Sequence, residues 1–366
     1  MVPTHKSSAW PLAWCYALLI VYASLYPFGE WRTQGISPLA FLPAPLPRYW
    51  TWFDVLSNAV GYGPLGFLVV LGGLRNGRRW TVLGALALCF FLSLTMESLQ
   101  SYLPSRVPSN VDLALNTVGG YAGALMAWLL ERLGVLDRWS RFRQRWFVEE
   151  SRGGMVLLAL WPVGLLFPAA VPLGLGQVLE RLEEALAVWL AGTPMLDWLP
   201  VRDVELQPLI PSAELLSVGL GGLVPCLLGY SIMRSLGRRG VLLFVVLGVG
   251  LGTTALSAAL SYGPVHAWSW LSLPVQWGVV LAWVLGLALI GLPRRACAAL
   301  CLLALAVNLS ILNQSPTSAY FAQTLQTWEQ GRFIRFNGLA QWVGWLWPYG
   351  LLAYLVARLS QREGGG

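Results

Sequence analysis

Long runs of apolar residues alternate with short polar segments over the whole chain. A helix that crosses a membrane needs about 20 mostly apolar residues. By this criterion the sequence predicts about ten membrane-spanning helices. They lie at residues 10–27, 55–74, 80–99, 111–132, 155–176, 212–233, 240–261, 271–292, 295–312 and 338–358. With a mean hydropathy of +0.61, the chain is expected to be an all-α, polytopic integral membrane helical bundle rather than a soluble protein.

The basic residues predict the orientation of these helices. If both termini are cytoplasmic, 17 of the 24 Lys and Arg residues fall in cytoplasmic segments. They are Lys6, Arg75, Arg78, Arg79, six arginines from Arg132 to Arg152, Arg234, Arg238, Arg239, Arg294, Arg295, Arg358 and Arg362. Because basic loops stay in the cytoplasm, this distribution predicts a multi-pass protein of the bacterial plasma (inner) membrane with both termini inside. It also accounts for the net charge of +7 without a nucleic-acid partner.

An internal repeat is predicted from matches at one fixed offset. Shifting the chain by 160 positions aligns residues 77–79 with 237–239, both "GRR", and Pro104 with Pro264. Two parallel four-helix repeats followed by two C-terminal helices would explain this offset. The expected organisation is a four-span unit, a basic cytoplasmic loop, a degenerate second four-span unit, and two final spans with a cytoplasmic tail. The boundaries are 1–133, 134–153, 154–293 and 294–366.

Polar residues gather where three predicted spans of the first unit reach the outer surface. These candidate ligand-binding residues are Asp54, Asn58, Glu97, Gln100, Arg106, Asp112 and Asn116. Three pairs in this set are spaced three or four residues apart, so each pair shares a helix face: Asp54 with Asn58, Glu97 with Gln100, and Asp112 with Asn116. Gly120 and Gly123 continue the Asp112 face and would let another helix approach closely. The second unit keeps little of this polarity: Glu214 aligns with Asp54, and His266 aligns with Arg106.

Helix capping is an alternative explanation for part of this cluster. Thr51 and Asp54, and Ser109 and Asp112, both have the spacing of a capping box at a helix start. Capping does not explain Asn58 and Asn116, one turn deeper. Glu97 lies near the end of its own helix, where the helix dipole disfavours a negative charge. The sequence contains no nucleophile or metal motif, and its five cysteines all lie in apolar spans, so neither a metal nor a cofactor is expected.

Residues 177–211 form the longest polar segment predicted outside the membrane. Val178, Leu179, Leu182, Leu186 and Trp189 recur there at helical spacing. This pattern predicts an amphipathic helix on the outer membrane surface.

The polar pattern of the first unit resembles the VanZ-like family over about residues 10–132. The similarity lies in "SLYPF", "FDVLSNAVGYGPLGF", "ESLQSYLPSR" and "SNVDLALNTVGGYAG". The family takes its name from low-level resistance to the lipoglycopeptide teicoplanin. The resemblance therefore implies an envelope function and an effect on glycopeptide susceptibility, without supplying a reaction.

Two functions remain open from the sequence. The first unit could bind an envelope lipid, a lipid-linked glycan or a lipoglycopeptide at the outer leaflet, with Arg106 holding an anionic group. Alternatively, it could be an intramembrane enzyme for a lipid-linked substrate. Glu97 would then be the general acid or base, and Asp112 the second carboxylate. The partners implied are membrane lipids or lipid-linked envelope glycans, and the sequence leaves the oligomeric state undetermined.

Overall fold

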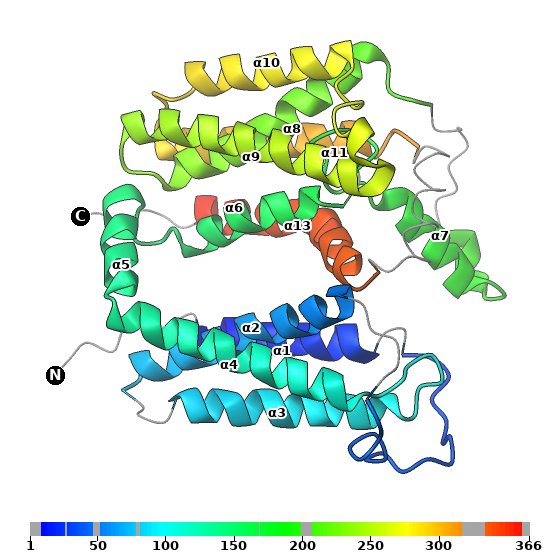
Figure 1. The fold of residues 1–366 in the computed structure, drawn as a ribbon. Coiled ribbons are helices and arrows are strands. Elements are labelled where there is room, and N and C mark those ends of the chain that lie inside the picture. Colours follow the sequence, from blue (N-terminus) through cyan, green and yellow to red (C-terminus); the bar gives the residue numbers. More distant parts are fainter. Residues whose placement is uncertain are drawn as a thin grey trace. The chain divides into compact units, whose positions relative to one another are not determined.

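The described part of the chain is mostly helical (Figure 1). The computed structural model describes residues 9–25, 28–46, 52–77, 81–167, 169–198, 207–316 and 334–360. Within these ranges the only bridge between extended residues joins Phe147 to Met233. The prediction of an all-α polytopic membrane protein is confirmed.

A helix lies in each of the ten segments predicted to span the membrane. The long ones are α2 (Trp52–Arg75), α3 (Thr81–Gln100), α4 (Asn110–Arg132), α8 (Pro211–Ile232), α9 (Leu236–Tyr262), α11 (Arg294–Leu312) and α13 (Ile334–Ser360). The shorter ones are α1 (Ala9–Leu25), α6 (Arg152–Leu165) and α10 (Leu273–Ala288). Among the described residues, six helices are both long and apolar enough to cross a membrane: α2, α3, α4, α8, α9 and α11.

The helix predicted at 155–176 is much shorter than expected. Helix α6 ends at Leu165, and the following residues are irregular. Its 14 residues rise about 21 Å, less than the roughly 30 Å of a bilayer core. Pro168 and Pro172 favour this early end, because each proline lacks an N–H donor and disfavours the helical conformation of the residue before it. Leu173, which has a positive φ of 60°, is buried in the core, so irregular backbone is packed inside protein.

Residues 1–141 and 142–366 form two compact units. The predicted basic loop at 134–153 contains a helix, α5 (Val135–Trp146), where the two units join. The predicted amphipathic segment also contains a helix, α7 (Leu179–Leu190), and its Leu182 and Trp189 side chains are exposed.

In the first unit, helices α2 and α4 touch along their backbones. A Cβ atom added to Gly119 would overlap the carbonyl oxygen of Ala59, and one added to Gly123 would overlap that of Gly63. Small residues at four-residue spacing thus face one another on both helices, a common way for helices to associate in membranes. The close approach predicted along the Asp112 face of α4 is confirmed at Gly123. It fixes the separation of α2 and α4 beneath the polar cluster.

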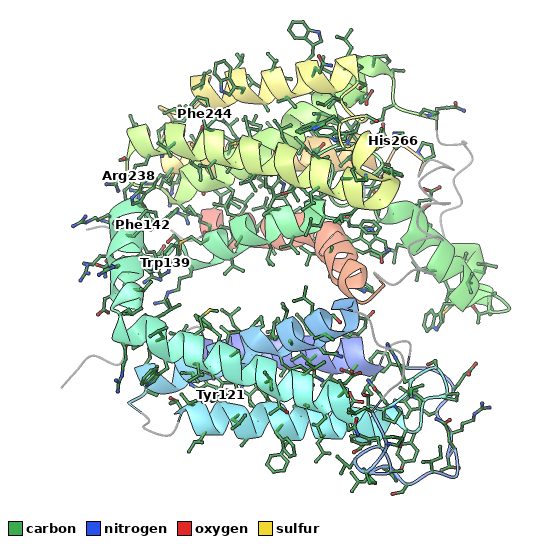
Figure 2. The ribbon with its side chains drawn as sticks, viewed as in Figure 1. Tyr121, Trp139, Phe142, Arg238, Phe244 and His266 are labelled. Carbon is green, nitrogen blue, oxygen red and sulfur yellow. The ribbon has the colours of Figure 1, made fainter. Side chains whose placement is uncertain are left out.

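In the second unit, most of α8 is buried, and α6, α9, α10 and α11 pack against it. Arginines close one end of this unit by donating to main-chain carbonyls. Arg239 binds Ile290 and Leu292, and Arg358 binds Ser231. Arg238, labelled in Figure 2, donates to the carbonyl of Arg145. These cations lie where helix dipoles favour positive charge.

The helix bounds follow the 160-residue offset approximately. Helices α2, α3 and α4 begin at residues 52, 81 and 110, and α8, α9 and α10 begin at 211, 236 and 273. In both units the first and third helices of the set pack together closely, at Gly119 in one and at Gly278 in the other. An origin by duplication stays a prediction.

We expect Gly119→Ala to destabilise the protein and Gly61→Ala to leave it unchanged or slightly more stable. Both changes replace a helical glycine, and alanine is favoured there by about 0.5–1 kcal/mol. Only Gly119 faces backbone, whereas nothing lies within 4 Å of a Cβ at Gly61. Overpacking costs about 1–3 kcal/mol. Thermal unfolding of both purified variants in one detergent would measure the difference, and equal midpoints would contradict the close packing of α2 on α4.

Candidate functional site

Glu97 is a buried carboxylate near the end of α3. Its side chain is 3% exposed, and Oε2 accepts a 2.8 Å hydrogen bond from the backbone N–H of Ser109. Ser109 is the N-cap of α4, where four N–H groups lack partners within the helix. Although Glu97 lies at the unfavourable end of its own helix, its charge therefore reaches the favourable end of the next one. The unfavourable interaction of Glu97 with the dipole of α3, expected from the sequence, is therefore offset by the dipole of α4.

This contact changes the capping box predicted at the start of α4. The hydroxyl of Ser109 accepts hydrogen bonds from the N–H groups of Val111 and Asp112, as expected for an N-cap. In a capping box the third helical residue, here Asp112, binds the N-cap's own N–H. In this structure that N–H donates to Glu97. Half of the predicted box is present, and Glu97 supplies the other half from a neighbouring helix.

Gln100 and Arg106 bind the end of α1. Gln100 Nε2 donates to the carbonyl of Ser24 at 3.0 Å, and Arg106 Nη2 donates to that of Ala23 at 3.3 Å. Helix α1 ends at Leu25, so both carbonyls belong to its last turn. A cation is stabilising there. Two predicted ligand-binding residues thus have a helix-capping role in this structure.

Asn116, Ser93 and Tyr62 form the buried inner end of the polar cluster, which we call its floor. Ser93 and Tyr62 were not singled out from the sequence. Asn116 is 6% exposed, and its Nδ2 donates to the hydroxyl of Ser93 at 2.9 Å. Asn116 Oδ1 is buried and accepts no hydrogen bond within the described residues. The Tyr62 hydroxyl is also buried and forms no hydrogen bond of normal geometry within the described residues, although the Ser93 hydroxyl and Glu97 lie close to it.

The signal that could have found Tyr62 and Ser93 is their spacing. Tyr62 follows Asn58 by four residues, and Ser93 precedes Glu97 by four, so each shares a helix face with a predicted site residue. Both lie inside apolar runs, where a single tyrosine or serine does not usually indicate a binding site.

The other predicted site residues lie around this floor. Asn58 on α2 and Asp112 on α4 are half-buried, each one turn before a floor residue. Asp54 belongs to α2, but its side chain lies outside the described residues. Hydrogen bonds join Glu97 to the start of α4, and Gln100 and Arg106 to the end of α1. The convergence of Glu97, Arg106 and Asp112 in one cavity stays a prediction.

A segment preceding α2, residues 28–46, lies against the rim of this cluster (Figure 1). The N–H of Arg32 donates to the Tyr102 carbonyl, and Gln34 Nε2 donates to that of Ser101. On the other side, Asn110 Nδ2 donates to the carbonyl of Ala44. The segment thus spans the turn between α3 and α4.

The aligned positions of the second unit carry no comparable buried carboxylate. Ser257, aligned with Glu97, donates to the carbonyl of Leu166. Glu214 accepts a 3.4 Å hydrogen bond from Ser272 in an exposed position. His266, labelled in Figure 2, is exposed and lies 3.4 Å from the Ser269 hydroxyl.

Comparison with known proteins gives one match. Residues 12–131 match the family model described as VanZ/LLP1. No curated protein and no solved structure matches the chain. The matched residues include all but the first three residues of α1, the whole of α2 and α3, and all but the last residue of α4, and so contain the whole polar cluster.

We expect Glu97→Ala to destabilise the protein more than Glu97→Gln. Alanine leaves the Ser109 N–H without its acceptor, which costs about 1–3 kcal/mol. Glutamine keeps an acceptor oxygen and loses only the charge, so its cost should be smaller. Unfolding midpoints in detergent would measure both changes. Glu214→Gln, at a more exposed carboxylate, serves as the control, and a stable Glu97→Ala protein would refute the role assigned to this contact.

Proposed function

Residues 12–131 form a VanZ/LLP1-family domain in a polytopic membrane protein, and from this we propose that the domain binds the polar headgroup of an envelope component at the outer leaflet of the bacterial plasma membrane. The chemistry required is a hydroxyl or amine group together with an anionic group. An envelope lipid, a lipid-linked glycan and a lipoglycopeptide such as teicoplanin all provide it. Binding of this kind would alter the response of the cell to glycopeptides.

The observation that carries the proposal is the pair of buried polar atoms without hydrogen-bond partners. Asn116 Oδ1 needs a donor, and the Tyr62 hydroxyl can provide or accept a hydrogen. Buried polar groups are almost always paired, so each exception requires an explanation. One ligand hydroxyl can accept from Tyr62 and donate to Asn116, and a ligand amine can donate to Glu97. Arg106, half-buried at the rim, supplies a cation for a phosphate or carboxylate.

Ligand access to this floor requires movement of the covering segment. Residues 28–46 are held at the rim through main-chain carbonyls of Ser101, Tyr102 and Ala44. Hydrogen bonds at a partly exposed rim contribute about 1 kcal/mol each, so binding of a headgroup can displace them. This segment also exposes Trp31, Ile36 and Leu46, which suit contact with the membrane surface beside the site.

The outward placement of the site predicts a labelling result. In a Cys15→Ser background, Val107→Cys should react with a membrane-impermeant maleimide in intact cells, because residue 107 is exposed in the α3–α4 turn. Asn76→Cys, exposed in the turn after α2, should react only after the membrane is permeabilised. The four other cysteines are buried and should give little background. Reaction of residue 107 only after permeabilisation would overturn the orientation and the outer-leaflet site.

Tyr62→Phe tests the binding function without disturbing the fold. The change removes a hydroxyl that has no hydrogen-bond partner, so the unfolding midpoint should not fall. The affinities for teicoplanin and for phosphatidylglycerol would be measured in nanodiscs. The Kd of the tighter-binding ligand should rise about fivefold, which corresponds to the loss of one hydrogen bond. Tyr230→Phe is the matched control, because that hydroxyl donates to Gly286 in the second unit and its loss should affect stability alone.

Two outcomes would count against binding as the function. Unchanged affinity for both ligands in Tyr62→Phe would remove the hydroxyl from the site. Conversion of a labelled lipid-linked substrate by the wild type, abolished in Glu97→Gln, would replace the binding function by the enzymatic one.

A further inference from the structure

An apolar groove of about 630 Å³ lies between α1, α2 and α3 of the first unit. Trp10 and Trp14 from α1, Leu65 and Val69 from α2, and Gly84 and Leu88 from α3 line its walls. Its volume is within the range of small-molecule sites. The groove is separate from the polar cluster, whose members Glu97, Arg106 and Asn116 do not line it.

Both ends of the groove are closed by helix contacts. At one end α1 meets α3 through the buried cluster of Leu25, Met96 and Leu103. At the other end Gly72 lies against the Trp10 ring, and Gly73 lies against Thr81. Between these ends the helices stand apart, and nothing lies within 4 Å of a Cβ added to Gly84. A helix of another protein could pack into the groove only if the groove were open along its full length. Because both ends are closed, a shorter and thinner occupant than a helix is favoured.

The dimensions of the groove suit a hydrocarbon chain. Its wall on α3 runs from Thr81 to Leu92, about 17 Å along the helix axis. One leaflet contributes about half of a hydrocarbon core that is roughly 30 Å thick. The walls are apolar except for Thr81 at the end. An acyl chain fits this length and chemistry.

A cation lies at the same end of the unit as Thr81. Arg75 is exposed in the last turn of α2, two residues after Gly73 and on a different face of that helix. It therefore does not line the groove, and only its long side chain could reach a headgroup at this end. Its position is complementary to an anionic headgroup at the membrane surface. We propose that this groove binds one acyl chain of an anionic lipid whose headgroup contacts Arg75. This lipid lies in the leaflet on the Arg75 side, opposite the leaflet of the headgroup site proposed above, and its binding is independent of that site.

Photolabelling of the protein in nanodiscs tests the groove. The probe is phosphatidylglycerol with a diazirine on one acyl chain, diluted into phosphatidylcholine. Gly84→Leu places a side chain in the groove, where nothing lies within 4 Å of the added Cβ, and it replaces a helical glycine, so the variant should fold about as well as the wild type. Labelling of α1 and α3 peptides should fall at least fivefold. Gly252→Leu is the control, because that glycine in α9 also faces open space but lies in the second unit.

The headgroup and the alternative occupants are tested in the same system. Arg75→Gln should remove the preference for the phosphatidylglycerol probe over a phosphatidylcholine probe with the same chain. Equal labelling of α1 and α3 in Gly84→Leu and wild type would overturn the proposal. Cross-linking to a second protein chain from a photoreactive residue at position 88 would do the same. Tyr62→Phe should not change this labelling, so failure here is distinguishable from failure of the outer-leaflet site.

Discussion

A carboxylate buried in a membrane helix must be compensated, and Glu97 is compensated by the N-terminus of α4. The bond from the Ser109 N–H fixes the end of α3 against the start of α4. The turn between them then carries Arg106 to the last carbonyls of α1, and Gln100 binds the same turn of α1. Three helix ends are thus joined at one level by groups that would each be costly if unpaired. The backbone contact of α2 with α4 completes the unit.

The second unit also binds helix ends with arginine. Arg239 and Arg358 donate to main-chain carbonyls, as Arg106 does in the first unit, whereas among the described residues a buried carboxylate at a helix N-terminus occurs only in the first unit. The residue 160 positions after Glu97 is Ser257, which needs no charge compensation. The most deeply buried helix, α8, is packed on several sides, and its contacts are largely apolar. These features suit a scaffold, whereas the polar chemistry of the molecule is concentrated in the first unit.

The apolar runs were sufficient to predict where the helices lie, because burial of backbone polar groups in lipid allows few other structures. They could not predict the early end of α6, where Pro168 and Pro172 override the apolar pattern. The candidate site was predicted as a set of polar positions at helix ends. The hydrogen-bond partners of these residues were not predictable. The partner of Glu97, for example, is a backbone N–H, which every residue except proline has. Tyr62 and Ser93 were missed because a single hydroxyl hardly alters an apolar run.

Helix capping and ligand binding are therefore separable within one polar cluster. Capping accounts for the hydrogen bonds that Glu97, Gln100 and Arg106 form with helix ends, and these bonds would be needed whether or not the unit binds anything. It does not account for the Tyr62 hydroxyl and Asn116 Oδ1. Both atoms are buried and have no hydrogen-bond partner within the described residues. Phenylalanine and leucine would fill similar volumes without the cost of about 1–3 kcal/mol for each unpaired group. Function in this unit is thus better sought at the two atoms that the fold does not use than at its most conspicuous charges.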